Sequence, residues 1–94
     1  MFKRGQLVIV DVDKFCHFYK PKLSGSNYDR DLWLKDWISY LNKVTNGTRI
    51  LRTGSQEGDA VFVETLNGES FWYLNIGVLI PYIEKTFCYL KYHL

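Results

Sequence analysis

The most regular pattern of apolar and polar positions lies between residues 26 and 45. Apolar side chains recur there at the i, i+3, i+4 and i+7 spacing of an amphipathic helix, namely Trp33, Leu34, Trp37, Ile38, Leu41 and Val44. Ser26 followed by Asp29 resembles a capping box, and Asn46-Gly47 supplies a left-handed residue of the kind that ends many helices. The pattern predicts a helix over residues 27–45 that lies outside a sheet and buries only its apolar stripe.

Runs of β-branched residues predict strands on both sides of this helix. The first strand is expected over Leu7–Val12, and it would place Asp11 and Asp13 together on one face. Residues 14–26 contain Pro21, Gly25 and two serines and are expected to form a loop. Three more strands are expected over residues 48–53, 60–66 and 69–75.

Asn67-Gly68 joins the last two of these strands and predicts a two-residue type I′ turn, because both residues tolerate a positive φ. Such a turn fixes the register, with Val63 opposite Trp72 and Phe62 opposite Tyr73. Neighbouring side chains point to opposite faces, so Val61, Val63, Trp72 and Leu74 would form a core face. The other face would then carry three rings, those of Phe62, Phe71 and Tyr73, around Glu64.

The C-terminal residues predict further extended structure. Residues 76–81 are expected to form a short 3₁₀ turn that leads into a final strand over residues 82–86. The tail, residues 87–94, is rich in β-forming residues, and as an exposed edge it could pair with a second copy of the chain. A homodimer through this C-terminal strand is therefore one expectation.

The order of these elements resembles the small SH3-like and KOW-type β-barrels of bacteriophage open reading frames. The segments that carry the resemblance are FKRGQLVIV, NGTRIL, GDAVFVETLNGESFWYLN and VLIP. The resemblance implies one SH3-like domain over residues 1–94, mainly β with one helix (α+β), in which the helix of residues 27–45 is inserted after the first strand. It also implies a binding module of a small viral or bacterial protein, with no particular ligand.

Composition narrows the class of protein. Ninety-four residues with 47% hydrophobic and 23% charged side chains are typical of one globular domain. The apolar stretch Leu7–Val10 is too short for the core of a signal peptide, so a cytoplasmic protein without a membrane partner is expected. Six Phe, seven Tyr and three Trp are more rings than a core of this size easily holds, so some should lie on the surface or in an interface.

Residues with catalytic or metal-binding chemistry are few, and their spacing is unfavourable. Cys16, His17, Cys88 and His93 are zinc-type ligands, but they lack the paired spacing of structural zinc sites. Asp11 and Asp13 are better explained as a solvated strand end than as a carboxylate pair, and Asn46-Gly47-Thr48 matches a glycosylation sequon that would be idle in the cytoplasm. A disulfide between the two cysteines stays open. The sequence thus predicts a protein without catalysis, cofactor or metal.

Two explanations of the surplus rings stay open. Trp33 and Trp37 of the helix could cover Phe62, Phe71 and Tyr73 in a second small core, or the rings could form a hot spot for a protein partner. The expected partner-binding residues are Phe62, Phe71, Tyr73, Glu64, Trp33, Trp37 and Tyr19. The resemblance to phage proteins implies that the partner is a host protein and that the chain is an accessory protein that inhibits a defence or transcription component.

The alternative function is a KOW-type nucleic-acid-binding module. A basic strip of Arg49, Arg52, Lys20 and Lys22, extended by Lys3 and Arg4, would lie beside stacking rings. The net charge of +2 is weak for such a module, because nucleic-acid-binding domains usually concentrate a larger basic excess on one face.

Overall fold

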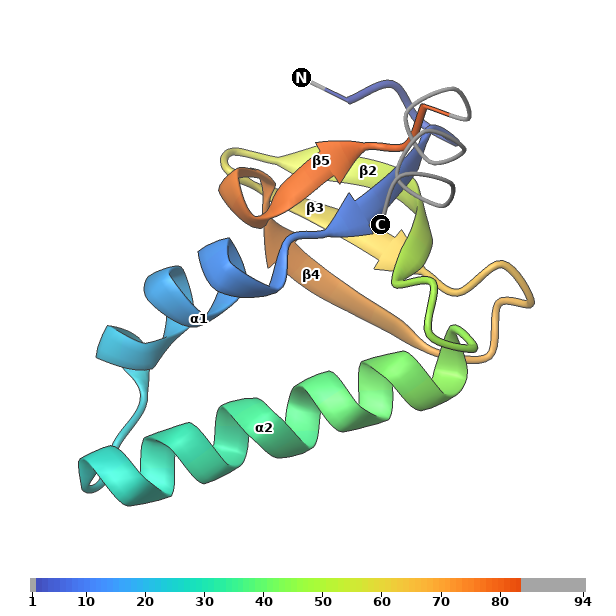
Figure 1. The fold of residues 1–94 in the computed structure, drawn as a ribbon. Helices are drawn as coiled ribbons and strands as arrows, with labels where there is room; N and C mark the ends of the chain where they lie inside the picture. Colours follow the sequence, from blue (N-terminus) through green and yellow to red (C-terminus); the bar gives the residue numbers. More distant parts are fainter. Residues whose placement is uncertain (1, 84–94) are drawn as a thin grey trace.

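A computed structural model of the chain describes residues 2–83, which form one antiparallel sheet and two α-helices (Figure 1). In chain order the elements are β1 (Leu7–Val10), α1 (Val12–Tyr19), the 3₁₀ turn η1 (Lys20–Lys22), α2 (Asn27–Val44), β2 (Ile50–Glu57), β3 (Ala60–Glu64), β4 (Phe71–Asn75), the 3₁₀ turn η2 (Ile76–Val78) and β5 (Leu79–Pro81). The strand order is β4-β3-β2-β1-β5, and every neighbouring pair is antiparallel.

The predicted α+β class is confirmed, but the sheet is not closed into a barrel. Within residues 2–83, β4 pairs only with β3 and β5 pairs only with β1, so these two strands are the edges of an open sheet. A strand, β5, lies at Leu79–Pro81, within the segment predicted as a 3₁₀ turn, whereas most of the strand predicted over residues 82–86 lies outside the described residues. The tail of residues 87–94, on which the predicted C-terminal homodimer depends, lies outside the described residues.

Helix α2 is confirmed almost to the residue, because local signals fix both of its ends. The Ser26 hydroxyl accepts a hydrogen bond from the Asp29 N–H (3.1 Å), and the Asp29 carboxylate accepts one from the Ser26 N–H (3.2 Å), which completes the predicted capping box. Beyond Val44 the chain reverses through Asn46 and Gly47, whose φ angles are +54° and +80°. This left-handed pair ends the helix.

Helix α1 replaces the loop predicted over residues 14–26, and it also shortens the first strand, which ends at Val10. Asp11 caps this helix, since its side chain accepts a hydrogen bond from the Lys14 N–H at 3.0 Å. The ring of Phe15 is then buried. Val12 continues the β-branched run of the strand in the sequence, yet in the structure it is the first residue of α1. The Asp11 cap favours this start of the helix.

The β3–β4 hairpin has the predicted register but a different turn. Val61 lies opposite Leu74, Phe62 opposite Tyr73 and Val63 opposite Trp72, as expected. The Thr65 N–H donates to the Ser70 carbonyl (2.9 Å), which makes residues 66–69 the loop, and Gly68 rather than Asn67 has a positive φ. The Asn67 side-chain oxygen instead accepts from the Thr65 hydroxyl and from the Glu69 N–H, which holds a wider turn than type I′.

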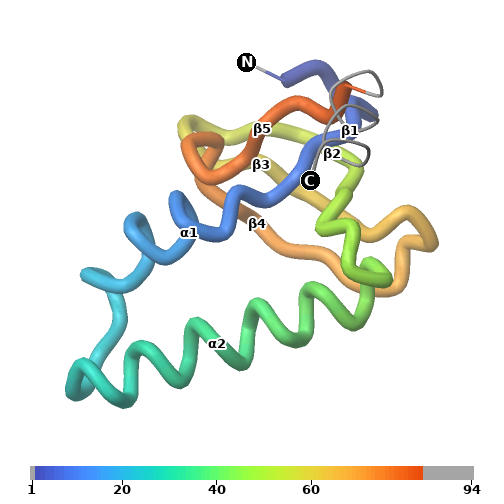
Figure 2. The backbone as a smooth tube through the Cα atoms, in the orientation of Figure 1, coloured from blue at the N-terminus to red at the C-terminus, as the bar shows by residue number. Residues whose placement is uncertain are grey.

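One hydrophobic core fills the space between the helices and one face of the sheet, here called the inner face. Figures 1 and 2 show both helices on that side of the sheet. The helices contribute Phe15, Leu34 and Leu41 to this core, and the strands and η2 contribute Val8, Val10, Leu51, Val61, Val63, Leu74, Val78 and Leu79. The opposite, outer face of the sheet is left without a helix among the described residues.

The Phe15→Ala variant should lose much of its stability, because the Phe15 side chain is 1% exposed. The centroid of its ring lies 4.1 Å from that of Trp37, on which it stacks, and 4.6 Å from that of Tyr19. We expect its free energy of unfolding to fall by about 3 to 5 kcal/mol. Urea denaturation followed by tryptophan fluorescence measures this loss. Phe71→Ala is the control, since that ring is 62% exposed and its loss should cost about 1 kcal/mol or less. Equal losses in the two variants would contradict this packing.

Candidate functional site

The outer face of the sheet presents side chains in a regular order across four strands. The register of the strands places Leu7, Arg52, Glu64 and Phe71 in one row that runs from β1 to β4. Phe62 and Tyr73 form the next pair on the same face, two residues along β3 and β4 from the pair of Glu64 and Phe71. The three rings predicted to share a face, Phe62, Phe71 and Tyr73, therefore do so, and we call them the outer aromatic platform.

The rings of the outer aromatic platform contact each other and are open to solvent. Phe62 stacks on Phe71 with ring centroids 5.5 Å apart, and it meets Tyr73 edge-on at the same distance. Phe71 is 62% exposed and Tyr73 is 57% exposed. Large rings exposed next to each other are unusual on a monomeric protein and mark binding surfaces more often than scattered ones.

Phe62 is the anchor of the platform, because its ring lies directly over the backbone of β2. A Cβ atom at Gly54 would come within 2.6 Å of Phe62 Cδ1, so only glycine leaves room for the ring in this position. The register of β2 against β3 shifts between Thr53 and Gln56, beside this glycine. The register shift and the missing side chain together leave room for the half-buried ring.

A shallow hollow of about 420 Å³ adjoins the platform and carries charge of both signs. Arg52 and Glu64 form an ion pair across β2 and β3 at 3.6 Å, and Glu64 thus lies beside the rings as predicted. The residues around the hollow are Arg4, Gly5, Arg52, Thr53, Gly54, Ser55, Phe62, Glu64 and Tyr73. A partner that covers the rings would therefore meet a polar rim on the β2 side.

The helix rings do not cover the outer aromatic platform, so the second small core, one of the two explanations left open by the sequence, is wrong. Trp37 stacks on Phe15 and meets Trp72 at 5.5 Å, which places it on the inner face. The Tyr19 hydroxyl accepts a hydrogen bond from the Asn75 N–H at 3.0 Å. Trp33 is 46% exposed on α2. Of the predicted partner-binding residues, Phe62, Phe71, Tyr73 and Glu64 are together, whereas Trp33, Trp37 and Tyr19 belong to the other side of the sheet.

The four residues of the predicted basic strip are dispersed. Arg52 lies on the outer face beside Glu64, whereas Lys20 forms an ion pair with Asp31 at 2.8 Å and Lys22 lies 4.0 Å above the Phe18 ring. Arg49 directly precedes β2. Its φ angle is +57°, and its backbone N–H donates a hydrogen bond to the Thr45 hydroxyl. The prediction of one strip therefore fails, because the 3₁₀ turn η1, which carries Lys20 and Lys22, follows α1 on the inner side of the sheet (Figure 1).

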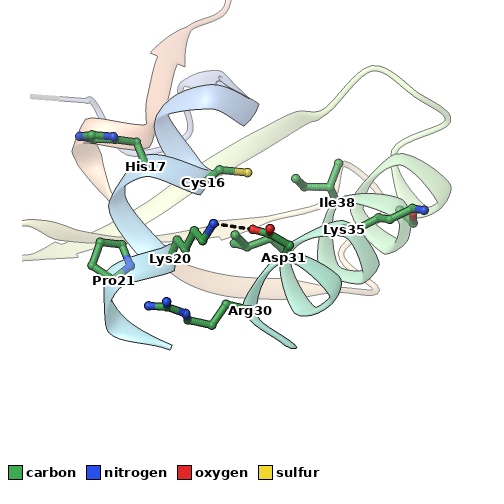
Figure 3. Close-up of a pocket in the computed structure, with 10 residues that line it drawn as sticks. Cys16, His17, Lys20, Pro21, Arg30, Asp31, Lys35 and Ile38 are labelled. Carbon is green, nitrogen blue, oxygen red and sulfur yellow. Dashed lines mark ion pairs between the residues drawn. The ribbon is translucent and has the colours of Figure 1, made fainter. Parts of the chain in front are cut away.

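A second hollow of about 840 Å³ separates α1 and η1 from α2 (Figure 3). The sequence could not indicate it without α1. Its lining combines apolar side chains, Leu34, Ile38 and Pro21, with the charged side chains of Lys20, Arg30, Asp31 and Lys35. Figure 3 shows the Cys16 thiol pointing from α1 toward α2.

Cys16 is a free thiol, and the groups around it make it less reactive. Burial raises its pKa, the carboxylates of Asp13 and Asp31 raise it further, and only Lys20 lowers it. A nucleophilic cysteine needs the opposite environment. His17 is exposed on the next position of α1, while Cys88 and His93 lie outside the described residues. Residues 2–83 contain no group of three side chains suited to hold a metal ion.

Searches with known family models, against curated proteins and against solved structures returned no match. Within residues 2–83, neither helix combines the length and the apolar character that a membrane span needs.

Alkylation of Cys16 should be slow near neutral pH and should quicken when Asp31 is neutralised. In a Cys88→Ser background, Asp31→Asn removes a carboxylate that raises the thiol pKa and releases Lys20, which lowers it. Both effects increase the thiolate fraction below the pKa, so the midpoint of the rate against pH should move to lower pH. The measurement is the rate of reaction with a thiol reagent from about pH 7 to pH 11.

Asp36→Asn is the matched control, because Asp36 also lies on α2 but has no effect on this thiol. A faster rate with an unchanged midpoint would mean that the substitution only improved access to the thiol, and it would contradict the electrostatic account.

Proposed function

We propose that this chain is a non-catalytic binding module that docks a protein partner on the outer aromatic platform. The observation that carries this proposal is the exposure of Phe71 and Tyr73, both more than half open to solvent while in contact with the anchored ring of Phe62. Aromatic side chains fixed in position lose little entropy on binding and bury a large area, which is why they dominate protein interfaces.

The arrangement of charge around the rings supports a protein rather than a small ligand. Binding hot spots are commonly apolar at the centre and polar at the rim. Here the rings form the centre, and Arg52 and Glu64, already paired with each other, form one side of the rim. The hollow beside them is shallow and open, unlike the deep clefts that enclose small molecules.

The fold supports the SH3-like resemblance as the finer part of this proposal. A meander of antiparallel strands whose last strand returns beside the first, after the short turn η2, fits such a binding module even though the described sheet stays open. In the setting that the resemblance implies, the partner is a host protein in the host cytoplasm, and the chain acts as an accessory inhibitor of a defence or transcription component.

A nucleic-acid strand is the second candidate, favoured by one observation. Arg4 and Arg52 share the hollow with Phe62 and Tyr73, which combines cations with stacking surfaces. The pairing of Arg52 with Glu64 and the dispersal of Lys20 and Lys22 weaken this candidate.

The test is affinity capture from a host lysate with the wild-type chain and with two kinds of platform variant. Phe71→Ser/Tyr73→Ser removes the exposed rings, and Gly54→Ala displaces the Phe62 ring without removing any aromatic group. Both should reduce partner retention about tenfold or more. Tyr28→Ser is the control, because this ring is 74% exposed on α2, away from the platform.

Equal retention by wild-type, platform and control chains would rule out the platform as the binding surface. Each capture is repeated after nuclease treatment. Retention that disappears with nuclease, and that falls steeply with salt, would transfer the function to nucleic-acid binding.

A further inference from the structure

Strand β4 exposes half of its backbone groups at the edge of the sheet. In an antiparallel pair, residues that bond to the partner strand alternate with residues whose N–H and C=O point away from it. The bonded pairs at the two ends of the hairpin are Thr65 with Ser70 and Asp59 with Ile76. With the observed register, Trp72 and Leu74 therefore bond to β3, and the N–H and C=O of Phe71 and Tyr73 point outward.

The next outward group on this edge is already paired. The Asn75 N–H donates to the Tyr19 hydroxyl of α1, which both confirms the alternation and ends the open stretch at Tyr73. Residues 2–83 contain no hydrogen-bond partner for the outward groups of Phe71 and Tyr73. Two donors and two acceptors in alternation, spaced as on a strand, are complementary to another extended backbone.

The two edges of the sheet differ in how they are protected against pairing. Proteins usually protect an edge with a short strand, a proline, a lysine or a bulge. The β5 edge is short and ends in Pro81. The β4 edge, with the sequence Phe-Trp-Tyr-Leu-Asn, has no charge, no proline and no register shift against β3. Its composition favours pairing.

We propose that β4 pairs with β4 of a second copy of this chain, antiparallel and centred on Trp72. In that register the N–H and C=O of Phe71 bond to the C=O and N–H of Tyr73 in the second copy, and the two-fold axis repeats the same bonds. Every outward group of the open stretch then has a partner. No charged residue of β4 meets a like charge, so electrostatic repulsion does not oppose the pairing.

The side chains on both faces of the edge fit this second copy. On the outer face Phe71 lies opposite Tyr73 of the second copy, an aromatic cross-strand pair of the kind that stabilises sheets. On the inner face Tyr40 of α2 contacts Trp72 at 6.3 Å and is 49% exposed, and Trp33 lies two turns before it on the same side of α2. These rings extend the apolar surface around the edge.

The dimer is separate from the proposed binding function, because strand pairing at an edge leaves the faces of the sheet open. It joins the outer aromatic platforms of two copies into one continuous surface. Loss of dimerisation and loss of partner binding are therefore distinct results.

The first experiment is sedimentation equilibrium together with amide hydrogen exchange, both across micromolar to millimolar protein. The mass should rise from that of the 11.1 kDa chain toward twice this value. Over the same range, exchange at the Phe71 and Tyr73 N–H groups should slow by about tenfold or more, while exchange at Trp72 and Leu74, bonded within the monomer, should change much less.

The second experiment compares Tyr73→Pro with Tyr73→Ala. Both remove the ring, but only proline removes the outward N–H, and neither removes a bond to β3. Proline should weaken dimerisation about tenfold more than alanine. The Phe71→Lys variant keeps the N–H and adds an edge charge, and it should also weaken the dimer if Tyr73→Pro does not fold.

Three results would overturn the proposal. They are a mass that stays at that of one chain, exchange at Phe71 and Tyr73 that does not depend on concentration, and equal effects of the proline and alanine variants together with no effect of Phe71→Lys. Slow exchange at the lowest concentration would assign the edge to an occupant within the same chain.

Discussion

A column of rings in contact holds the two helices against the inner face of the sheet. Tyr19, Phe15 and Trp37 follow each other at centroid distances of 4.6 and 4.1 Å, and Trp37 then meets Trp72 of β4 at 5.5 Å. This column joins α1, α2 and the edge strand, and it forms most of the aromatic part of the core. The position of every other surface depends on it, because it decides which face of the sheet the helices cover.

The outer aromatic platform is exposed as a consequence of this column. Trp72 points inward and joins the column, so its neighbours Phe71 and Tyr73 must point outward, where no helix within residues 2–83 covers them. The pleat of β4 thus divides three consecutive rings between a structural and a surface role. The stability of the fold and the chemistry of the outer face can therefore be altered separately.

Features governed by local signals could be predicted from the sequence. The capping box of Ser26 and Asp29, the apolar stripe of α2 and the register of the β3–β4 hairpin were all correct. Helix α1 was missed because Val12 extends a β-branched run, although Asp11 and the spacing of Val12, Phe15 and Tyr19 carried a helical signal. A strand and a short helix were both compatible with these residues, and only tertiary packing of Phe15 decided between them.

The face on which α2 packs could not be predicted, because both faces of the hairpin offered rings to Trp37. The choice depends on how the chain leaves β1, and the Asp11 cap of α1 sets that direction. The dispersal of Lys20 and Lys22 from Arg52 has the same cause. The alternation of side chains along β3 and β4 predicts that the three platform rings share one face. Their exposure depends on where α2 packs, and this follows from α1, which the sequence pattern does not indicate.

The hydrogen bond from the Asn75 N–H to the Tyr19 hydroxyl links the docking of α1 to the length of the exposed strand edge. If α1 detaches, the edge gains one more free donor and loses the helix that ends it. A lesion in α1 would then convert a limited edge into a longer template for strand-by-strand assembly. The Tyr19 hydroxyl thus limits the length of the edge that is open to strand addition.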